Sequence, residues 1–347
     1  MAANPANPEA FMRRAIQLSR RGYPAPNPRV GCVLVRGGKI VGEGYHQHAG
    51  GSHAEVVALQ QAGANARGAD AYVTLEPCNH RGRTGPCTEA LMEAGVKRVI
   101  YAVDDPNPVA AGGAARLRKA GLQVESGLLA EEAESVNSQF LTAVRRQLPF
   151  VTLKAAMGLD GRSVLSSGDS KWITSPKARA LARKMRGERG AVLVGCGTVL
   201  ADHPSLTARS RGIVNEPTRI ILDPQGRAQS YPWPSGGEVI RVTEPGRGGE
   251  IEQPLVGGVF DLRALLTQLY ARGIRGVLVE GGPPTINGFL KQGLGDELAL
   301  FSAGKILGDG ATWTGVMPTG RISERPEWSL ETVKRVGPDL LTCWHRM

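Results

Sequence analysis

Apolar and polar residues alternate with two different periods along the chain, and these periods predict its secondary structure. In the first half, an amphipathic helical stretch at 11–19 precedes two apolar strands at 30–35 and 40–44. The same reasoning predicts further helices at 53–62, 87–94, 114–120 and 131–144 and strands at 71–75, 98–103 and 123–125. This interleaving of helices and strands is typical of a three-layer α/β domain.

A polar segment at 145–149, Arg-Arg-Gln-Leu-Pro, separates this pattern from a new apolar strand at 150–156. We therefore expect one domain over residues 1–147 and a second over 148–347. The second is again α/β, with helices predicted at 176–185, 262–272 and 285–291 and strands at 191–194, 219–222, 276–279 and 297–301. The Pro- and Gly-rich region 232–257 predicts exposed loops around one strand at 238–242.

Length and composition agree with two globular domains, since 347 residues exceed what one hydrophobic core usually organises. The formal net charge of +10 is spread over both halves, without a basic arm. Such a charge suits a small phosphorylated substrate or an anionic cofactor at least as well as a nucleic acid. Because the chain has neither an apolar signal core nor a run of about 18 apolar residues, we expect a cytoplasmic protein without membrane contact. We also expect a homo-oligomer.

The most specific motif is His53-Ala54-Glu55, followed by Cys78 and, after eight residues, Cys87. One imidazole and two thiolates suit Zn²⁺ and leave a fourth tetrahedral position open, which is typical of catalytic sites. Glu55 is then placed to shuttle a proton. The pattern is close to the zinc deaminase signature H-x-E…P-C-x-x-C, although the gap between the cysteines is longer here. The remaining thiols are predicted to be packing residues: Cys32, Cys196 and Cys343.

The segment 78–87, Cys-Asn-His-Arg-Gly-Arg-Thr-Gly-Pro-Cys, resembles the extended metal loop of the bifunctional riboflavin biosynthesis deaminase/reductase family. Segments 26–31 (Pro-Asn-Pro-Arg-Val-Gly), 44–46 (Gly-Tyr-His) and 105–108 (Asp-Pro-Asn-Pro) resemble the same family. The resemblance implies zinc at His53, Cys78 and Cys87 and a cytidine-deaminase-like fold. It implies substrate contacts from Asn27, His46, His80 and Asp105, two of which, Asn27 and Asp105, could equally be turn formers. Asn79 and Gly85 depart from the family's Ser and Pro.

Two glycine turns in the second half each follow an apolar strand, at 195–198 and at 281–282. Backbone amides at a strand-to-helix turn can bind phosphate, but most such turns bind nothing, and neither is a G-x-G-x-x-G fingerprint. From the residues alone, both the cofactor site and a purely structural turn stay open.

Segments 154–161, 167–174 and 198–209 resemble the reductase of the same family, whose fold is like that of dihydrofolate reductase. The resemblance implies an NADPH-dependent domain, with Gly158 in place of the family's Ser. The implied cofactor contacts are Ala156, Trp172, Thr198, Asp202, Gly281, Gly282, Pro283, Pro284, Thr285, Ile286, Asn287 and Gly288. The implied substrate contacts are Lys154, Ser170, Arg186, Leu206, Arg209 and Glu280.

Chemistry suggests roles for some of these residues. Arg186 and Arg209 can bind a ribose phosphate, and Lys154 or Asp160 can hold or polarise an opened sugar. A helical Arg is more often solvated, however, and Asp160-Gly161 is also a typical hairpin turn.

We therefore expect a two-step enzyme that deaminates a phosphorylated pyrimidine and then reduces its ribosyl group. The alternatives are a nucleic-acid-editing deaminase with an RNA-binding module, which the lack of a basic stripe disfavours, and a non-enzymatic dinucleotide-binding partner domain.

Overall fold

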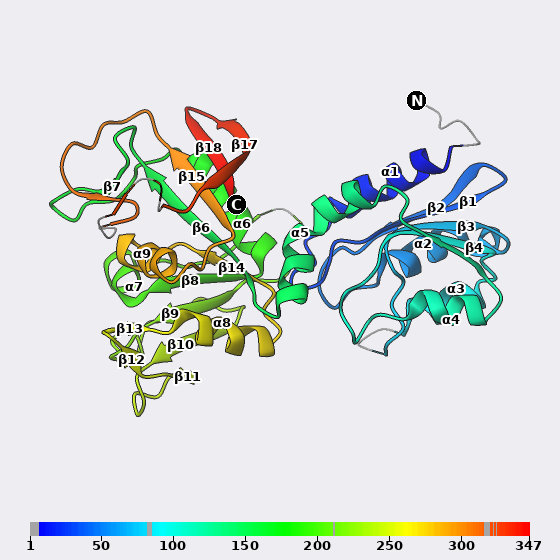
Figure 1. Ribbon diagram of the computed structural model, residues 1–347, viewed down its shortest axis with the longest axis horizontal. Coiled ribbons are helices and arrows are strands. Elements are labelled where there is room, and N and C mark those ends of the chain that lie inside the picture. Colours follow the sequence, from blue (N-terminus) through cyan, green and yellow to red (C-terminus); the bar gives the residue numbers. More distant parts are fainter. Residues whose placement is uncertain (1–6, 82–84, 211, 316–319, 322, 324) are drawn as a thin grey trace. The chain divides into compact units, whose positions relative to one another are not determined.

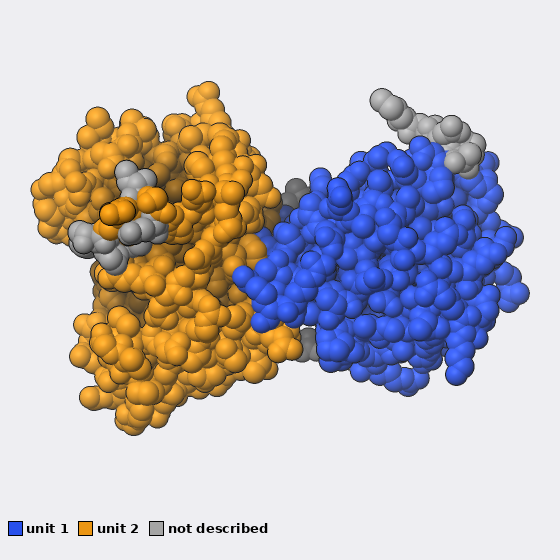
Figure 2. All heavy atoms as spheres, in the orientation of Figure 1, with its two compact units in different colours: residues 1–146 blue, residues 147–347 orange. Residues whose placement is uncertain are grey.

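The computed structural model describes residues 7–81, 85–210, 212–315, 320–321, 323 and 325–347 (Figure 1). The chain divides into two compact units, Met1–Arg146 and Gln147–Met347, which Figure 2 distinguishes by colour. Each unit has its own sheet and its own hydrophobic clusters. Among the helices of the described residues, none is both long and apolar enough to cross a bilayer.

Unit 1 is built on a five-stranded sheet in the order β2-β1-β3-β4-β5. The β1–β2 and β1–β3 pairs are antiparallel, whereas β3, β4 and β5 run parallel. The strands are β1 (Gly31–Arg36), β2 (Lys39–Tyr45), β3 (Asp70–Leu75), β4 (Arg98–Val103) and β5 (Gln123–Ser126). The helices are α1 (Pro8–Ser19), α2 (Ala54–Ala62), α3 (Cys87–Glu93), α4 (Gly113–Lys119) and α5 (Ala130–Arg146), with a 3₁₀ turn η1 (Gly63–Ala66).

Alternate residues of each strand face opposite layers, which gives unit 1 two cores. Val33 and Val35 of β1 pack with α1 and α5 on one face of the sheet. Cys32 and Leu34, their immediate neighbours, pack with α2, α3 and α4 on the other face. Because side chains alternate across a strand, one apolar run supplies both cores, and the predicted three-layer α/β fold is confirmed.

A glycine in β2 sets how closely α2 approaches the sheet. A Cβ added at Gly44 would lie 2.2 Å from the carbonyl oxygen of Ala54, the first residue of α2. Only a residue without a side chain therefore lets the start of α2 lie against β2. This contact positions His53 and Glu55, which are the N-cap and the second residue of that helix.

Unit 2 is built on a nine-stranded sheet in the order β11-β10-β9-β8-β14-β6-β15-β18-β17, counted over the described residues. Its strand pairs are parallel from β11 to β15, whereas β18 pairs antiparallel with β15 and with the edge strand β17. The strands are β6 (Phe150–Met157), β8 (Ala191–Gly195), β9 (Thr218–Leu222), β10 (Val239–Thr243), β11 (Ile251–Glu252), β14 (Gly276–Val279), β15 (Glu297–Ser302), β17 (Trp328–Val336) and β18 (Asp339–Arg346). Unit 2 also contains two separate two-stranded sheets. One pairs β12 (Leu255–Val256) with β13 (Val259–Phe260), and the other pairs β7 (Arg162–Val164) with β16 (Ala311–Thr312).

Helices cover both faces of this sheet. The apolar residues of α8 (Leu262–Ala271) and α9 (Pro283–Lys291) pack on one face in the larger cluster. Those of α6 (Pro176–Arg189) and α7 (Cys196–Asp202) belong to separate clusters with the alternate residues of the same strands. The strand patterning at 150–156, 191–194 and 276–279 correctly predicted buried central strands.

Several elements of unit 2 differ from the prediction. The predicted glycine turn at 195–198 is instead the start of helix α7, with Gly195 as its N-cap. The region 232–257 contains β11 and β12 in addition to the expected strand. The β17–β18 hairpin was not predicted, because most of the β17 side chains are exposed or half-buried and their sequence lacks an apolar period. The five cysteines are free, as predicted, and Cys32 and Cys196 are buried while Cys343 is half-buried.

Candidate active sites

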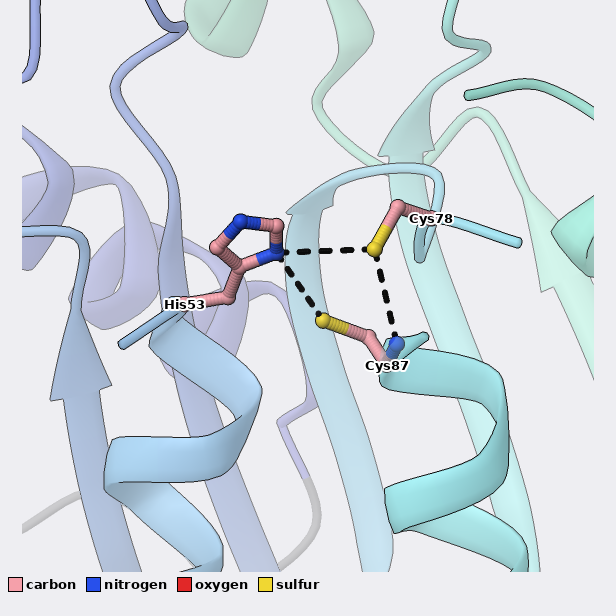
Figure 3. A group of neighbouring side chains, drawn as sticks. All are labelled: His53, Cys78 and Cys87. Atoms are coloured by element: carbon pink, nitrogen blue, oxygen red, sulfur yellow. Dashed lines mark hydrogen bonds between the residues drawn. The ribbon is translucent and has the colours of Figure 1, made fainter. Parts of the chain in front are cut away.

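Three side chains of unit 1 converge where β3 ends and where α2 and α3 begin (Figure 3). The Nδ1 atom of His53 lies 3.4 Å from Sγ of Cys78 and 3.3 Å from Sγ of Cys87. One ligand atom from each residue lies within 4.8 Å of the others. An imidazole and two sulfurs at this spacing match the donor set of a catalytic zinc site. Residues 82–84 of the connecting loop lie outside the described residues.

Hydrogen bonds among the three groups shift their pKa values in opposite directions. Hydrogen bonding from Cys87, and then from His53, lowers the pKa of Cys78 to about 4. The hydrogen bond to Cys78 correspondingly raises the pKa of His53 and of Cys87 above their ordinary values. A divalent cation between the sulfurs would stabilise the thiolate form of both cysteines, so the residues fit zinc.

Glu55 lies on the first turn of α2 and is buried, with 3% of its surface exposed. Burial raises the pKa of its carboxyl group to about 7, and the charge of Cys78 adds to this effect. A carboxyl group that titrates near neutrality can accept a proton and release it again in one catalytic cycle.

Asn27 and His46 form a hydrogen-bonded pair beside this group. Nδ2 of Asn27 lies 3.1 Å from Nε2 of His46, whose Nδ1 lies 3.1 Å from the carbonyl oxygen of Ser52. Because that carbonyl can only accept, Nδ1 carries the proton and Nε2 accepts from Asn27. Burial lowers the pKa of His46, which keeps the ring neutral. Its ring centroid is 5.2 Å from that of His53.

His80 and Asp105 lie on loops that follow the parallel strands β3 and β4. Asp105 is buried, and this burial raises its pKa to about 6, although its carboxylate accepts a hydrogen bond from the backbone of Asn107 at 2.9 Å. Nδ1 of His80 is buried without a hydrogen-bond partner among the described residues. A buried polar atom in this state is an expected contact point for a bound molecule.

Unit 2 contains a cavity of about 800 Å³ at the carboxyl ends of β6, β8 and β14. Such a position, beyond the carboxyl ends of parallel strands, is where open α/β sheets bind ligands. Most of the expected reductase residues line this cavity: Lys154, Ala156, Ser170, Thr198, Asp202, Glu280, Gly281, Gly282, Pro283, Pro284, Thr285, Ile286 and Gly288.

The other expected residues lie elsewhere. The Asn287 amide donates to the carbonyl of Thr314 at 2.7 Å, and Trp172 is exposed with the Arg179 guanidinium 4.3 Å above its ring. Leu206 is buried in an apolar cluster, while Arg209 is exposed.

Asp160 also lies outside the cavity lining, and its carboxylate is occupied by the backbone. It accepts from the amides of Leu307 and Gly308 at 3.0 and 2.8 Å, and these bonds lower its pKa. The residue therefore closes a loop in this structure, which agrees with the turn interpretation of its sequence.

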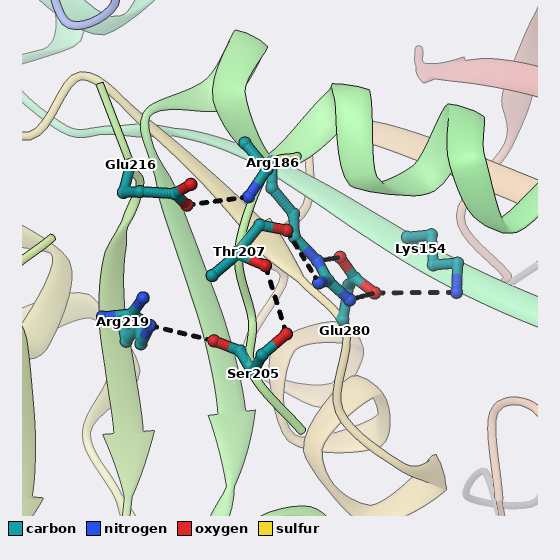
Figure 4. Close-up of polar contacts among 8 residues, drawn as sticks. Lys154, Arg186, Ser205, Thr207, Glu216, Arg219 and Glu280 are labelled. Carbon is teal, nitrogen blue, oxygen red and sulfur yellow. Dashed lines mark hydrogen bonds and ion pairs between the residues drawn. The ribbon is translucent and has the colours of Figure 1, made fainter. Parts of the chain in front are cut away.

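A buried ion pair lies at the edge of the cavity (Figure 4). The guanidinium of Arg186 donates to both carboxylate oxygens of Glu280, at 2.6 and 3.1 Å, and Nζ of Lys154 lies 3.7 Å from one of them. Burial alone would raise the pKa of Glu280, but the charges of Arg186 and Lys154 hold it below its ordinary value. Glu280 is therefore a charged group at the cavity, with Arg186 as its counter-ion.

Comparison with known proteins gives two family matches. Residues 5–103 match the cytidine and deoxycytidylate deaminase zinc-binding region, and residues 149–342 match the RibD C-terminal domain. The chain is 41% identical to the riboflavin biosynthesis protein RibD of Escherichia coli, over 97% of this chain and 98% of that protein. It is 42% identical to RibD of Aquifex aeolicus, with the same coverage.

Solved structures agree with these relatives. The chain superposes on Acinetobacter baumannii RibD with a TM-score of 0.86 at 37% identity, covering 98% of both chains. A deaminase/reductase from Thermotoga maritima gives a TM-score of 0.84 at 38% identity, again over 98% of both chains.

The chain belongs to the RibD family. It is a bifunctional deaminase and reductase of riboflavin biosynthesis, with zinc and NADPH as cofactors, as the sequence predicted. The expected pairing of a cytidine-deaminase-like domain with a dihydrofolate-reductase-like domain is confirmed as well.

The cavity residues of this RibD-family chain fit a dinucleotide cofactor. A Cβ added at Gly281 would lie 2.4 Å from Cβ of Thr285, so only glycine permits the turn into α9. The first two residues of α9 are prolines, which have no N–H, and the amides of Thr285 and Ile286 bond to the carbonyl of Gly282. The amides of Gly281 and Gly282 are therefore the donors that this turn can offer to a phosphate.

Sequence reasoning missed residues that shape the metal loop of the deaminase unit. The buried carboxylate of Glu76 accepts from the backbone amides of Ala114 and Asp105, at 2.9 and 3.4 Å. Arg116 donates to Asn79 and to Glu89, at 2.8 Å each. These partners lie between 27 and 38 residues apart, and no local pattern in the sequence indicates such contacts.

Proposed function

We propose that residues 1–147 catalyse the first reaction, the hydrolytic deamination of 2,5-diamino-6-ribosylamino-4(3H)-pyrimidinone 5′-phosphate. Water replaces the 2-amino group, and ammonia leaves. His53, Cys78 and Cys87 would hold the zinc ion, and their mutual distances support this assignment. When bound, zinc makes water reactive enough for hydrolysis at neutral pH.

Glu55 is the proposed proton carrier of this reaction. Its carboxylate takes a proton from the attacking water and delivers it to the departing amine, which leaves as ammonia. The burial of Glu55, and the resulting pKa of about 7, support both transfers because the group is poised between its two protonation states.

Four further residues of the same unit are proposed substrate contacts: Asn27, His46, His80 and Asp105. The Asn27–His46 pair presents a neutral imidazole edge beside the metal group, which suits a neutral pyrimidine ring. Asp105 can accept hydrogen bonds from amino groups, and the unpartnered Nδ1 of His80 offers a further polar contact.

Residues 148–347 would then reduce the ribosyl group of 5-amino-6-(5-phosphoribosylamino)uracil to the ribityl form. NADPH supplies hydride, which adds to C1′ of the ring-opened imine, and the imine nitrogen takes up a proton. We assign the cofactor contacts to the cavity residues around 198–202 and 281–288, together with Ala156, Trp172 and Asn287.

The substrate would lie against the charged edge of the same cavity. Lys154, Ser170 and Glu280 line it, and Arg186 holds the Glu280 carboxylate in place. Arg209 is exposed and could receive the phosphate, whereas the buried side chain of Leu206 limits its contact to the main chain. Asp160 is assigned no contact with the substrate, because its carboxylate accepts hydrogen bonds from the amides of Leu307 and Gly308. A cytoplasmic location and a homo-oligomeric state remain predictions.

The observation that carries the proposal is the convergence of His53, Cys78 and Cys87 next to the buried Glu55. Separate expression of the two units tests it. Residues 148–347 alone should oxidise NADPH with the deaminated substrate and not with the aminated one, whereas residues 1–147 should release ammonia from the aminated substrate. A folded C-terminal unit that oxidises no NADPH would contradict the assignment of reactions to units.

A further inference from the structure

The stretch His203–Arg209 of unit 2 has an unusual backbone. It forms neither helix nor strand, and His203, Leu206 and Arg209 have positive φ angles of 47°, 49° and 40°. In the described part of the chain only two other non-glycine residues, Leu129 and Gln147, share this property. Left-handed backbone is unfavourable for residues with a Cβ, so the surrounding structure must impose it.

Side chains from outside the stretch hold four of its backbone groups. The Tyr231 hydroxyl donates to the carbonyl of Pro204 at 3.2 Å, and Nε of Arg219 donates to that of Ser205 at 3.1 Å. Arg186 donates to the carbonyl of Thr207 at 3.1 Å, and the carboxylate of Glu216 accepts from the amide of Ala208 at 2.9 Å. Figure 4 shows the last three of these anchors around Ser205 and Thr207.

The Arg219 anchor is fully buried. Its guanidinium also donates to the carbonyl of Gly236 at 2.7 Å, and its Nη2 has no hydrogen-bond partner among the described residues. Burying a charge is unfavourable unless hydrogen bonds compensate it, and this guanidinium donates to the carbonyls of Ser205, Gly236 and Gly237. The stretch also adjoins the cavity, since Asp202 lines it and Arg186 joins Thr207 to Glu280.

We propose that Arg219 and Glu216 are positioning residues of the reductase. They fix the backbone of 203–209 so that Arg209 and the main chain at Leu206 meet the phosphorylated end of the substrate. This inference rests on the proposed function, which assigns those two residues to the substrate. Neither Arg219 nor Glu216 needs to touch the substrate itself.

The test uses Glu216 variants of the full-length protein and two substrates, the phosphorylated one and its dephosphorylated form. Glu216→Ala should raise the reductase KM for the phosphorylated substrate about tenfold, with kcat changed less than about threefold, because a charged hydrogen bond to Ala208 is lost. The KM for the dephosphorylated substrate should stay within about twofold, as should the deaminase rate.

Conservative and matched variants sharpen this test. Glu216→Gln retains an oxygen that can accept from Ala208 and should restore most of the KM. Glu238→Ala removes a nearby exposed carboxylate and should behave as wild type. Hydrogen exchange of a peptide covering 205–210 should be faster in Glu216→Ala than in Glu216→Gln.

Arg209→Ala distinguishes failure of the positioning role from failure of the proposed function. If Arg209→Ala loses the preference for phosphate while Glu216→Ala keeps its KM within about twofold, the positioning role is wrong and the proposed function stands. If Arg209→Ala keeps the preference, the phosphate role itself is wrong. Should Glu216→Ala fail to fold, the same KM criterion applied to Arg219→Lys, which retains the charge, decides the outcome.

Discussion

Replacement of Arg186 by Met should show how strongly the buried ion pair stabilises unit 2. Methionine keeps an unbranched apolar stem but removes both hydrogen bonds to Glu280 and the one to the carbonyl of Thr207. The carboxylate that remains has only 7% of its side chain exposed, so water cannot take the place of the guanidinium.

The magnitude follows from that burial. Removing one partner of a buried ion pair typically lowers the free energy of unfolding by roughly 3–5 kcal/mol, because the other charge is left without a partner. Lys154, 3.7 Å from Glu280, offsets part of this loss. We therefore expect the free energy of unfolding of unit 2 to fall by about 3 kcal/mol, which corresponds to a lower Tm by roughly 6–12 °C for a unit of this size.

Urea unfolding followed by tryptophan fluorescence measures this change selectively, because the five tryptophans of the chain all lie in unit 2. A double-mutant cycle with Glu280→Gln should give a coupling energy of about 2 kcal/mol or more, since the neutral amide no longer needs a counter-ion. In the wild type, the pKa of Glu280 is lower in the folded than in the unfolded chain. The ionised carboxylate therefore stabilises the fold at pH values above the ordinary carboxyl pKa, and this stabilisation is lost as the pH falls through the folded-state pKa. The difference between Arg186→Met and wild type should therefore shrink at acidic pH.

A coupling energy near zero would refute this reasoning. If Arg186→Met were equally destabilising with Gln at position 280, the loss would come from the Thr207 contact instead. If stability were unchanged but the reductase KM for the phosphorylated substrate rose, Arg186 would act as a direct phosphate ligand.

Three further predictions concern the two active sites. Glu55→Gln should keep about one zinc per chain by elemental analysis yet lower the rate of ammonia release by about 100-fold or more, and an unchanged rate in the zinc-loaded variant would contradict the proton-carrier role. Cys87→Ser should lose both zinc and deaminase activity. Because the pKa of Asp105 is raised to about 6, the deaminase KM should rise as pH falls through that value. Asp105→Asn should abolish this dependence, and a persistent limb near pH 6 would assign it to another group. Arg209→Ala should raise the reductase KM for the phosphorylated substrate by roughly 10- to 100-fold, as expected for a lost charged hydrogen bond, without affecting deamination; equal losses with the dephosphorylated substrate would indicate a structural role.

Local pattern predicted much of the fold. The strand at 98–103 has the predicted bounds, and the helix at 53–62 and the strand at 71–75 differ from prediction by one residue at the start. These elements were predictable because each buries a face whose period appears in its own sequence. The convergence of His53, Cys78 and Cys87 was predictable from residue type, since one imidazole and two thiols at this spacing suit a shared zinc ion.

Contacts between distant segments were decided by the tertiary structure alone. From the sequence, Arg186 is either a solvated helix residue or a phosphate ligand, and its ion pair with Glu280, 94 residues further along the chain, is seen only in the folded structure. Arg219 lies in an apolar strand pattern and gave no sign that its guanidinium is buried against the carbonyl of Ser205. The spacing of apolar residues along the sequence indicates which face of a helix or strand is buried. The hydrogen-bond partner of a polar group, in contrast, is determined only when the chain folds and removes that group from water.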